Sequence, residues 1–495
     1  MSYAAAIDAL NALAPELYTQ PGRPRRKFSL AEIGILLADL GDPQQRFPGI
    51  LIAGTNGKGS TASTLASILA ASGLRAGLYT SPHLNRPNER IRINGAEISN
   101  DDFAARYFTV HGAAERLIAS EKLSQHPSFF ETLTAMAFLE FARGPVDIAV
   151  LEVGLGGRLD ATNIVQPLLS VITDISLDHT EWLGPTISAI AREKAGILRR
   201  NGVLVTLPQH PEANQSIGEM ASALNVRAIS ATPFMPPANA APDQPYPVEI
   251  LGATIQVDSP LHGAHQHRNL ALALAAAAEL AQHHNFPVMP QSIEAGIRAT
   301  RWPGRLEEIR IGPTLWVLDV AHNPAGAWAL RAGLRPLFDA APSPHHADSG
   351  TVPRSSLLTL RRPKGKDPHD ERAVSADSSN CPRTLVFACL RDKPLPEIAQ
   401  ILFPLFDRVV FAPIHSPRAA TMESLLAAAA ATGTPAQAAD SVAEALQLAR
   451  TPPTPVPPVS KPPQGLIVVA GSVYLVGEAR AILMGESQQA GSTRP

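Results

Sequence analysis

The part of the chain best suited to chemistry is a glycine-rich segment with one lysine, Gly54-Thr55-Asn56-Gly57-Lys58-Gly59-Ser60. It follows the apolar residues 50–53 and precedes a segment in which Leu65, Ile68 and Leu69 recur at helical spacing. Glycines let successive backbone N–H groups turn toward an anion, and the helix adds the positive end of its dipole. The lysine can reach the outer phosphates of a nucleotide. The segment therefore predicts a phosphate-binding loop, and the alternative is an ordinary glycine turn between strand and helix.

The spacing of this segment departs from the common phosphate loop, which reads G-x-x-x-x-G-K-[ST]. Here Gly59 separates Lys58 from Ser60, and no glycine lies five residues before Gly57. The pattern alone therefore indicates phosphate binding without indicating a common P-loop protein.

Two further groups follow predicted strands. Glu152 ends the apolar run 147–152, and His179 comes after the run 168–173. Open α/β sheets bind ligands at the carboxyl ends of their strands. Glu152 is therefore a candidate holder of Mg²⁺, unless it caps a helix or ends its strand in solvent. His179 taken alone would more often be a surface or core histidine, but its position after a strand makes it a candidate metal ligand. Between them, the glycine-rich loop 153–163 presents Arg158, Asp160 and Asn163.

Apolar runs alternate with helical patterns, as in a buried parallel sheet covered by helices. We predict an α/β protein in which a doubly wound parallel-sheet domain with a P-loop, residues 1–299 including a short N-terminal helical segment, is followed by a smaller Rossmann-like α/β domain, residues 300–484. The boundary is placed where helix-rich sequence ends in the Pro303-Gly304 turn. The predicted strands are 49–53, 76–80, 147–153, 168–173, 202–206, 314–319, 384–389, 408–412 and 465–470.

Three segments do not resemble folded structure. Residues 340–383 combine Ser, Pro, His and mixed charges with few apolar residues, so we predict a disordered and dispensable insertion. Residues 451–463 are rich in proline and are expected to form an extended linker, although they also resemble a ligand for proline-binding modules. The tail 485–495 is expected to be disordered.

Composition excludes several classes of partner. Lys and Arg number 42 and Asp and Glu 44, which gives a net charge of −2, so neither nucleic acid nor a membrane surface is an expected partner. The two cysteines, Cys381 and Cys389, lack C-x-x-C spacing, which disfavours a disulfide framework and a cysteine zinc site. Residues 1–13 make a poor signal peptide, and the alanine-rich stretch 270–280 is too short to cross a bilayer. We expect a cytoplasmic protein.

Several motifs in a fixed order resemble those of the folylpolyglutamate synthase/dihydrofolate synthase family, a branch of the Mur ligase superfamily. The resemblance covers residues from about 20 to 480 apart from the two inserted segments, and the unusual Gly59 agrees with this family's phosphate loop. The motifs after that loop are Ser81-Pro82-His83-Leu84, Glu89-Arg90-Ile91, residues 151–163, Leu177-Asp178-His179-Thr180-Glu181-Trp182-Leu183-Gly184, Arg192-Glu193-Lys194-Ala195-Gly196 and Asp319-Val320-Ala321-His322-Asn323-Pro324.

The resemblance implies an ATP-dependent ligase that phosphorylates a carboxylate and joins it to the amino group of L-glutamate. It implies two Mg²⁺ ions, with Ser60 on the first and Ser81, Glu152 and His179 on the second. It also implies that CO₂ converts Lys194 into a carbamate, an anion that helps to hold magnesium. The alternative is that Lys194 pairs with Glu193 or another carboxylate on a helix surface.

For ATP, the resemblance implies binding by Asn56, Gly57, Lys58, Gly59, Ser60, Asn269, Arg305 and Asp319. His322 is placed at the same cleft and, with Lys58, His179 and Lys194, is a candidate catalytic residue. For the pterin substrate it implies Phe129, Phe130, Glu131, Thr132, Leu159, Asp160 and Ala161. The motifs resemble the bifunctional bacterial form more closely, so we expect a monomer that acts on dihydropteroate and then on reduced folates. The alternatives are a monofunctional folylpolyglutamate synthase, another Mur-type ligase, or a nucleotide-binding regulatory protein without turnover.

Overall fold

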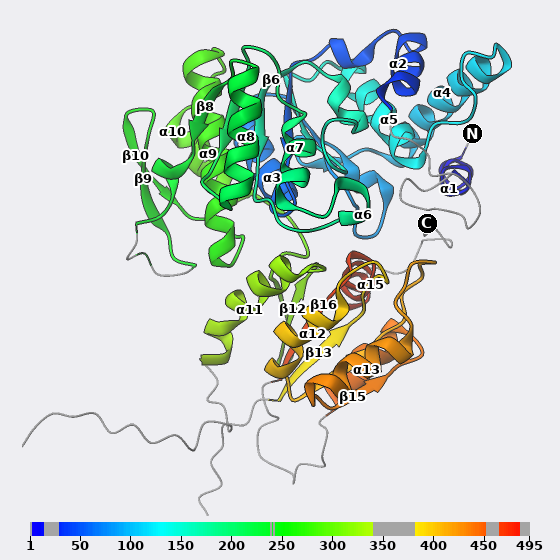
Figure 1. Ribbon diagram of the computed structural model, residues 1–495, viewed down its shortest axis with the longest axis vertical. Coiled ribbons are helices and arrows are strands. Elements are labelled where there is room, and N and C mark those ends of the chain that lie inside the picture. Colours follow the sequence, from blue (N-terminus) through cyan, green and yellow to red (C-terminus); the bar gives the residue numbers. More distant parts are fainter. Residues whose placement is uncertain are drawn as a thin grey trace, which may run out of the picture.

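The computed structural model describes residues 2–13, 29–237, 240, 243–339, 382–451 and 465–485. The described residues form two large sheets, each with helices on both faces, and a two-stranded sheet, and the two units built on the large sheets are stacked along the long axis of the molecule (Figure 1). The first sheet has eight strands and the second has six. The chain passes from the first unit to the second between Ala299 and Glu307.

The first sheet is parallel over six of its strands, and β3 and β4 extend it antiparallel at one edge. A continuous apolar run such as Gly49–Ala53, buried along its whole length, forms a central strand because both faces of the sheet are covered. In order across the sheet, the strands are β4 (Ala96–Glu97), β3 (Ile91–Ile93), β2 (Ala76–Tyr79), β5 (Ile148–Glu152), β1 (Gly49–Ala53), β6 (Pro167–Ile172), β7 (Val203–Thr206) and β8 (Arg227–Ser230).

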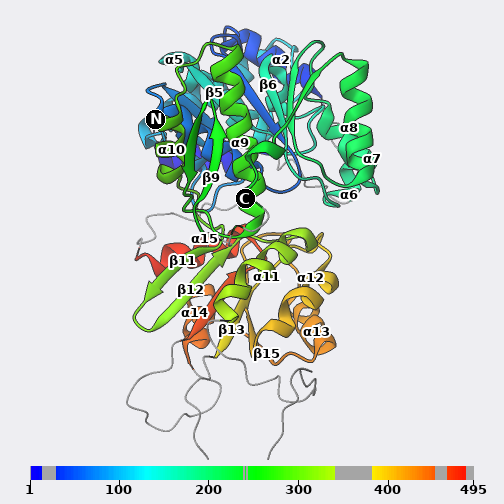
Figure 2. The same ribbon diagram turned by 90° about the vertical axis from the view of Figure 1, so that its left-hand side faces the viewer.

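Helices cover both faces of this sheet (Figure 2), and a hydrophobic core lies on each face. One core is built with α1 (Tyr3–Asn11), α2 (Leu30–Asp39), α4 (Asn100–Ala119), α5 (Phe129–Arg143), α7 (Ile187–Ala195) and α8 (Pro211–Ala223). The other is built with α3 (Lys58–Ala71), α9 (Ala264–His283), α10 (Pro290–Ala299) and the hairpin of β9 (Tyr246–Ile250) and β10 (Ala253–Val257). The arrangement is the predicted doubly wound α/β fold.

The second sheet is parallel except for its first strand, β11, which pairs antiparallel with β12. Its strands in order are β11 (Glu307–Ile311), β12 (Thr314–Asp319), β16 (Leu466–Ala470), β13 (Arg383–Phe387), β14 (Arg408–Phe411) and β15 (Ala436–Ala438). The helices of one face are α11 (Pro324–Asp339), α12 (Leu395–Leu402) and α13 (Met422–Thr432), and those of the other are α14 (Val442–Arg450) and α15 (Val473–Leu483).

All nine predicted strands are present, with ends that differ by at most two residues. The predicted insertion 340–383 ends too late by two residues, because Pro382 and Arg383 are described and Arg383 begins β13. The rest of that segment lies outside the described residues, as do 452–463 of the proline-rich stretch and 486–495 of the tail.

Strand register brings the predicted site together. In the first sheet β1 lies between β5 and β6, and Ile52 pairs with Glu152 while Ala53 pairs with Ile172. The three strands therefore end at the same level, and the loops that follow them meet. Thr55 in the loop after β1 donates its backbone N–H to the carbonyl of Asp174 after β6, at 2.8 Å.

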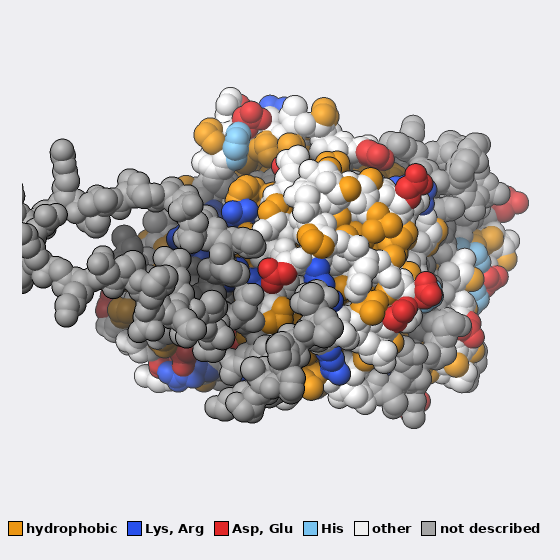
Figure 3. All heavy atoms as spheres, turned by 90° about the horizontal axis from the view of Figure 1, so that it is seen from below, with side chains coloured by type: hydrophobic (Ala, Val, Ile, Leu, Met, Phe, Trp, Pro, Cys, Tyr) orange, Lys and Arg blue, Asp and Glu red, His pale blue; other side chains and the backbone are white. Residues whose placement is uncertain are grey.

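Within the described residues, no helix combines the length and apolar character needed to cross a bilayer. The face seen from below in Figure 3 shows acidic and basic side chains interspersed among apolar ones.

Candidate active site

The glycine-rich loop forms a cradle that only glycine can build. Gly54 and Gly57 have φ values of +155° and +88°, a region that other residues rarely adopt. A Cβ on Gly54 would lie 1.7 Å from Thr173 Oγ1, and one on Gly57 would lie 2.1 Å from Asn269 Oδ1. The backbone is thus held against two neighbouring elements, and α3 begins at Lys58 with its N-terminus toward the loop. This is the geometry of an anion site at a helix N-terminus.

The unusual Gly59 has a steric reason. It lies in the first turn of α3, and a Cβ there would approach the indole ring of Trp302 to 2.6 Å. Trp302 belongs to the passage between the two units, so the passage packs directly on the phosphate loop. The extra glycine therefore lets the linker contact the nucleotide-binding loop.

Replacement of Gly59 by alanine is expected to lower the free energy of unfolding by about 1–3 kcal/mol, because the new methyl group overpacks the contact with Trp302. ATP should bind more weakly, since the loop must shift. Urea unfolding and ATP titration measure the two effects. Gly218→Ala is the matched control: a methyl group on this helical glycine would have nothing within 4 Å, and alanine there should stabilise the helix by up to about 1 kcal/mol. Wild-type stability of Gly59→Ala would contradict the assignment.

Lys58 and Glu152 face each other at the base of the cleft. Lys58 Nζ lies 4.0 Å from Glu152 Oε1 and donates to the carbonyl of Thr55 at 3.2 Å. The second carboxylate oxygen of Glu152 accepts the backbone N–H of Ser81 at 3.1 Å. Burial raises the pKa of Glu152, and the charge of Lys58 opposes that shift. Arg305 and Arg90 also act on this carboxylate, more weakly than Lys58. A buried carboxylate is the kind of oxygen ligand that Mg²⁺ prefers.

Lys194 lies inside the site and not on a helix surface. It is 5% exposed, and Nζ donates to the carbonyl of Gly54 at 2.7 Å. Burial, followed by the charge of Lys58, lowers the pKa of Lys194 to about 7. The neighbouring Glu193 pairs instead with Arg158, at 2.9 Å. The alternative interpretation of Lys194, a surface pair with Glu193, is therefore wrong.

The glycine-rich loop after β5 positions Lys194. A Cβ on Gly157 would lie 2.7 Å from the carbonyl of Glu193, and the backbone N–H of Arg158 donates to the same carbonyl at 2.8 Å. The glycines let the loop lie directly against the backbone of α7, the helix that carries Lys194. Asn163 completes the junction by donating to the carbonyl of Gly196 at 3.1 Å.

Asp178 is the centre of a network that joins the two units. It accepts Lys393 Nζ at 2.6 Å and Asn323 Nδ2 at 3.0 Å, and His322 Nε2 lies 3.7 Å away. Burial alone would raise the pKa of Asp178, but its contacts with His322, His179 and Lys393 outweigh burial and hold that pKa far below its ordinary value. Lys393, His322 and Asn323 all belong to the second unit. The carboxylate of Asp178 thus links the first unit to the second beside the larger cavity.

His179 is held in an unusual backbone conformation beside this network. Its φ of 50° is in the left-handed region, which is uncommon for a residue with a side chain. Burial, and after it the charge of Lys393, lowers the pKa of His179 to about 3. The imidazole is neutral at pH 7 and keeps a lone pair for a metal ion.

The larger cavity, of about 570 Å³, lies above the phosphate loop between the two units. Asn269 donates to Gln266 Oε1 at 2.8 Å, and burial lowers the pKa of Arg305. Both oxygens of Asp319 accept backbone N–H groups, from Leu306 and Ala321. The predicted residues that line this cavity are Asn56, Gly57, Lys58, Gly59, Ser60, Ser81, Glu152, His179, Lys194, Asn269, Arg305, Asp319 and His322.

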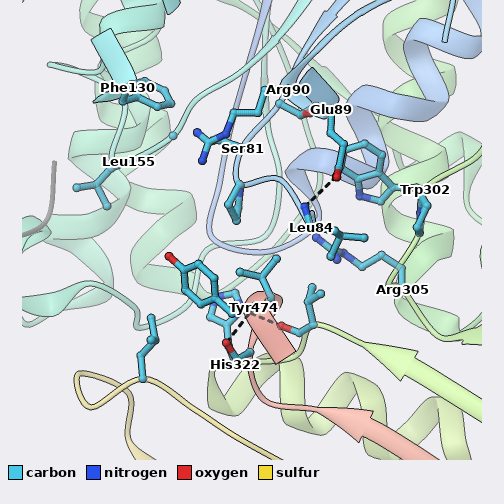
Figure 4. Close-up of a pocket in the computed structure, with 18 of the residues that line it drawn as sticks. Ser81, Leu84, Glu89, Arg90, Phe130, Leu155, Trp302, Arg305, His322 and Tyr474 are labelled. Atoms are coloured by element: carbon cyan, nitrogen blue, oxygen red, sulfur yellow. Dashed lines mark hydrogen bonds between the residues drawn. The ribbon is translucent and has the colours of Figure 1, made fainter. Parts of the chain in front are cut away.

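A smaller cavity, of about 270 Å³, adjoins the first and shares Ser81, His179, Arg305 and His322 with it. Figure 4 shows Phe130 and Arg90 from the first unit on one side and Tyr474 and His322 from the second unit on the other. The mixture of aromatic surface, guanidinium groups and a lysine, Lys393, fits a flat aromatic ligand that carries carboxylates.

Of the predicted pterin-binding residues, one lines a cavity and the others do not. Phe130 lines the smaller cavity, whereas Phe129, Glu131, Thr132, Leu159, Asp160 and Ala161 line neither cavity. Glu131 accepts the backbone N–H of Ser128 at 2.7 Å and so caps α5. Asp160 accepts the backbone N–H groups of Leu155 and Thr162, and burial raises its pKa. These carboxylates shape the loops around the cavity.

The sequence interpretation missed Trp302, Tyr474, Arg90 and Lys393 as cavity residues. Lys393 had a usable signal, because it follows the predicted strand 384–389 and so lies at the carboxyl end of a parallel sheet. The contacts of Trp302 and Tyr474 depend on how the two units meet, for which hydrophobic periodicity gives no signal.

Comparison with known proteins agrees with this geometry. The Mur ligase middle domain matches residues 52–277. The dihydrofolate synthase/folylpolyglutamate synthase of Mycobacterium tuberculosis is 36% identical over 424 residues, which are 81% of this chain and 77% of that protein. The corresponding Bacillus subtilis protein is 32% identical over 412 residues, 81% of this chain and 84% of its own.

Among solved structures, folylpolyglutamate synthase of Mycobacterium tuberculosis, complexed with ADP and AMPPCP, superimposes with a TM-score of 0.76 at 34% identity. The match covers 92% of this chain and 95% of that one. An FPGS–AMPPCP–folate complex gives a TM-score of 0.75 at 30% identity and covers 98% of this chain and all of that one, 100%.

Proposed function

The chain belongs to the folylpolyglutamate synthase/dihydrofolate synthase family, and we propose that it is an ATP-dependent ligase that joins L-glutamate to dihydropteroate and to reduced folates. One observation carries the proposal. The phosphate loop, Glu152, His179 and Lys194 converge at one end of the first sheet, where the larger and the smaller cavity adjoin. We assign the larger cavity to the nucleotide and the smaller one to an aromatic carboxylate. A ligase that activates a carboxylate with ATP needs these two cavities to meet.

Magnesium fits the donors at this junction. Glu152 offers a buried carboxylate, His179 a neutral imidazole, and Ser60 and Ser81 hydroxyl groups. We propose that Ser60 holds one ion with the nucleotide and that Ser81, Glu152 and His179 hold a second. When bound, the ions neutralise the charge of the phosphates and of the substrate carboxylate. Lys58, at the N-terminus of α3, is placed to contact the outer phosphates of the nucleotide.

We propose further that Lys194 carries a carbamate derived from CO₂. Carbamate formation requires the neutral amine, whose nitrogen attacks CO₂ and loses a proton. A lysine with a pKa of about 7 is about half neutral at pH 7, whereas an ordinary lysine is almost wholly charged. Glu152 contributes one negative charge and His179 none, so a carbamate would add an anion with two oxygens to a site that has few.

In the proposed reaction, an oxygen of the substrate carboxylate attacks the γ-phosphorus of ATP and ADP leaves. The amine of glutamate then attacks the acyl carbon, and inorganic phosphate leaves with the bridging oxygen. Arg305 lines both cavities, so its guanidinium is placed to neutralise charge at the point of transfer. His322 lines both cavities as well, and its Nδ1 contact with the carbonyl of Val320, at 2.8 Å, orients the ring. We propose that it faces the reacting carboxylate and amine.

The dual activity is supported by the relatives of Mycobacterium tuberculosis and Bacillus subtilis, each named for both synthases. The Lacticaseibacillus casei relative, 39% identical over 307 residues, is named folylpolyglutamate synthase alone, which makes a monofunctional enzyme the second candidate. Purified protein should release ADP in a glutamate-dependent manner with both dihydropteroate and tetrahydrofolate. Release with tetrahydrofolate but not with dihydropteroate would leave the monofunctional enzyme. Release with neither would contradict the ligase assignment.

A further inference from the structure

A second group of metal-binding side chains lies outside the cleft, where α4 ends. His111 and Glu115 are one turn apart on this helix, and His126 reaches them from the loop 120–128 that leads into α5. Glu115 Oε1 lies 2.9 Å from His126 Nε2 and 3.8 Å from His111 Nε2. One ligand atom from each residue lies within 4.8 Å of the other two.

These separations suit a small transition-metal ion. Two ligands of one tetrahedral Zn²⁺, each about 2.0–2.2 Å from the metal, are about 3.3–3.5 Å apart. The two measured separations from Glu115 lie on either side of this value. Each of the two distances from Glu115 Oε1 therefore differs from the tetrahedral value by less than 1 Å.

The two histidine rings are stacked in the structure, so one of them must change its orientation before both can bind the same ion. His111 stacks on the buried ring of Tyr107, with centroids 5.6 Å apart and an angle of 13° between the planes. His126 also stacks on His111, with centroids 5.4 Å apart and an angle of 8° between the planes. Parallel rings cannot both direct in-plane lone pairs at one ion, so His126 must turn about its side-chain bonds. Both histidine side chains are 37% exposed, but His126 is carried by the loop 120–128 and His111 by a helix, so His126 is the ring that would turn.

We propose that His111, Glu115 and His126 form a binding site for Zn²⁺ or a similar transition-metal ion, with water as the fourth ligand. Two imidazole nitrogens and one carboxylate oxygen are a donor set that favours such ions over Mg²⁺, which prefers oxygen ligands. The alternative is a hydrogen-bonded group without metal, in which Glu115 simply accepts from the two rings.

A second His–Glu–His group in the chain provides a contrast. Glu279 lies 3.1 Å from His283 Nδ1 and 3.7 Å from His284 Nε2, but its carboxylate is 3% exposed and pairs with both terminal nitrogens of Arg227. A metal ion there would have to displace a guanidinium from a buried carboxylate. Glu115 is 56% exposed, so an ion can reach it from solvent.

Metal binding at the first group would fasten the loop 120–128 to α4. The loop ends at Ser128, the N-cap of α5, and Phe130 in the first turn of α5 lines the smaller cavity. Figure 1 shows α4 and α5 side by side. A bound ion would therefore restrain the start of α5, which carries the aromatic residue Phe130 of the smaller cavity.

The test uses the full chain freed of metal by a chelator, then Zn²⁺ in competition with an indicator dye and in the presence of excess Mg²⁺. We expect one Zn²⁺ bound with a Kd of about 1 µM or tighter, and slower amide hydrogen exchange in residues 120–128 when it binds. His126→Ala and Glu115→Gln should each weaken this binding by at least about tenfold and remove the exchange effect.

His283→Ala is the matched control and should bind Zn²⁺ as wild type does, which excludes the second group. Circular dichroism and ATP binding establish that each variant is folded. If His126→Ala and Glu115→Gln both keep the wild-type Zn²⁺ affinity, or if Zn²⁺ leaves exchange in residues 120–128 unchanged, the hydrogen-bonded group without metal is the correct description. Zn²⁺ held by Glu152 and His179 would survive in both variants and so is distinguished from the proposed site.

Discussion

Replacement of Lys194 by alanine is expected to reduce ligase turnover by at least about 100-fold while leaving ATP binding within a few-fold of wild type. The side chain is buried against the phosphate loop, where its Nζ donates to the backbone carbonyl of Gly54. Its loss removes the proposed anion from the metal site. Lys58 and the loop backbone remain to hold the nucleotide.

Lys194→Arg separates the proposed anionic role from a cationic one. Arginine keeps the positive charge but does not form a carbamate, so turnover should stay as low as in the alanine variant. Short carboxylic acids, added to Lys194→Ala, should restore part of the turnover by occupying the vacated space, whereas amines should not. Turnover is measured as glutamate-dependent ADP release. An arginine variant with wild-type turnover, or rescue by amines, would show that Lys194 acts as a cation.

The second large effect is expected at Asp178. Asp178→Ala leaves Lys393, whose side chain is 5% exposed, without its carboxylate partner. Removing one member of a buried ion pair costs about 3–5 kcal/mol, because the other charge stays buried. Because the pair joins the two units, we expect this cost to weaken the association of the second unit with the first. Calorimetry should show a lower first transition, and turnover should fall with it.

Two further variants show whether the loss of stability in Asp178→Ala comes from the unpaired ammonium of Lys393. Asp178→Ala combined with Lys393→Met leaves no unpaired ammonium, so it should recover most of the thermal stability but not the turnover. Asp392→Ala, next to Lys393, is the control: its partner Arg418 is 28% exposed, and a pair so exposed contributes about 0–1 kcal/mol. If Asp178→Ala melts as Asp392→Ala does, the network around Asp178 does not hold the units together.

Strands with continuous apolar runs were predictable because both faces of their sheets are covered. β1, β5 and β16 are buried along their whole length, and the ends of each lie within two residues of the predicted ones. The strands that the sequence did not reveal are short or partly exposed. β8 and β15 have mostly exposed residues, and β9 alternates between buried and exposed positions. A search for continuous runs passes over such strands.

The site was predictable to the extent that it lies on one sheet. Lys58 and His179 follow β1 and β6, and Glu152 is the last residue of β5, so the rule for the carboxyl ends of adjacent parallel strands brings them together. The contacts of Asp178 with Lys393 depend on the docking of two units, for which local pattern gives no signal. For Glu131 the sequence did carry a signal, which was overlooked. We predicted a substrate contact because this carboxylate lies beside aromatic residues, but its position three residues after Ser128 is that of a capping box.

The central claim, that the chain activates a folate-type carboxylate as an acyl phosphate, is tested most directly with substrate labelled by ¹⁸O in that carboxylate. Labelled dihydropteroate or tetrahydrofolate would be incubated with ATP, Mg²⁺, L-glutamate and the protein, and the inorganic phosphate analysed by mass spectrometry. We expect one ¹⁸O atom in each phosphate released, because the bridging oxygen leaves with the phosphorus. Release of ADP with unlabelled phosphate, or of AMP and pyrophosphate, would contradict activation through an acyl phosphate.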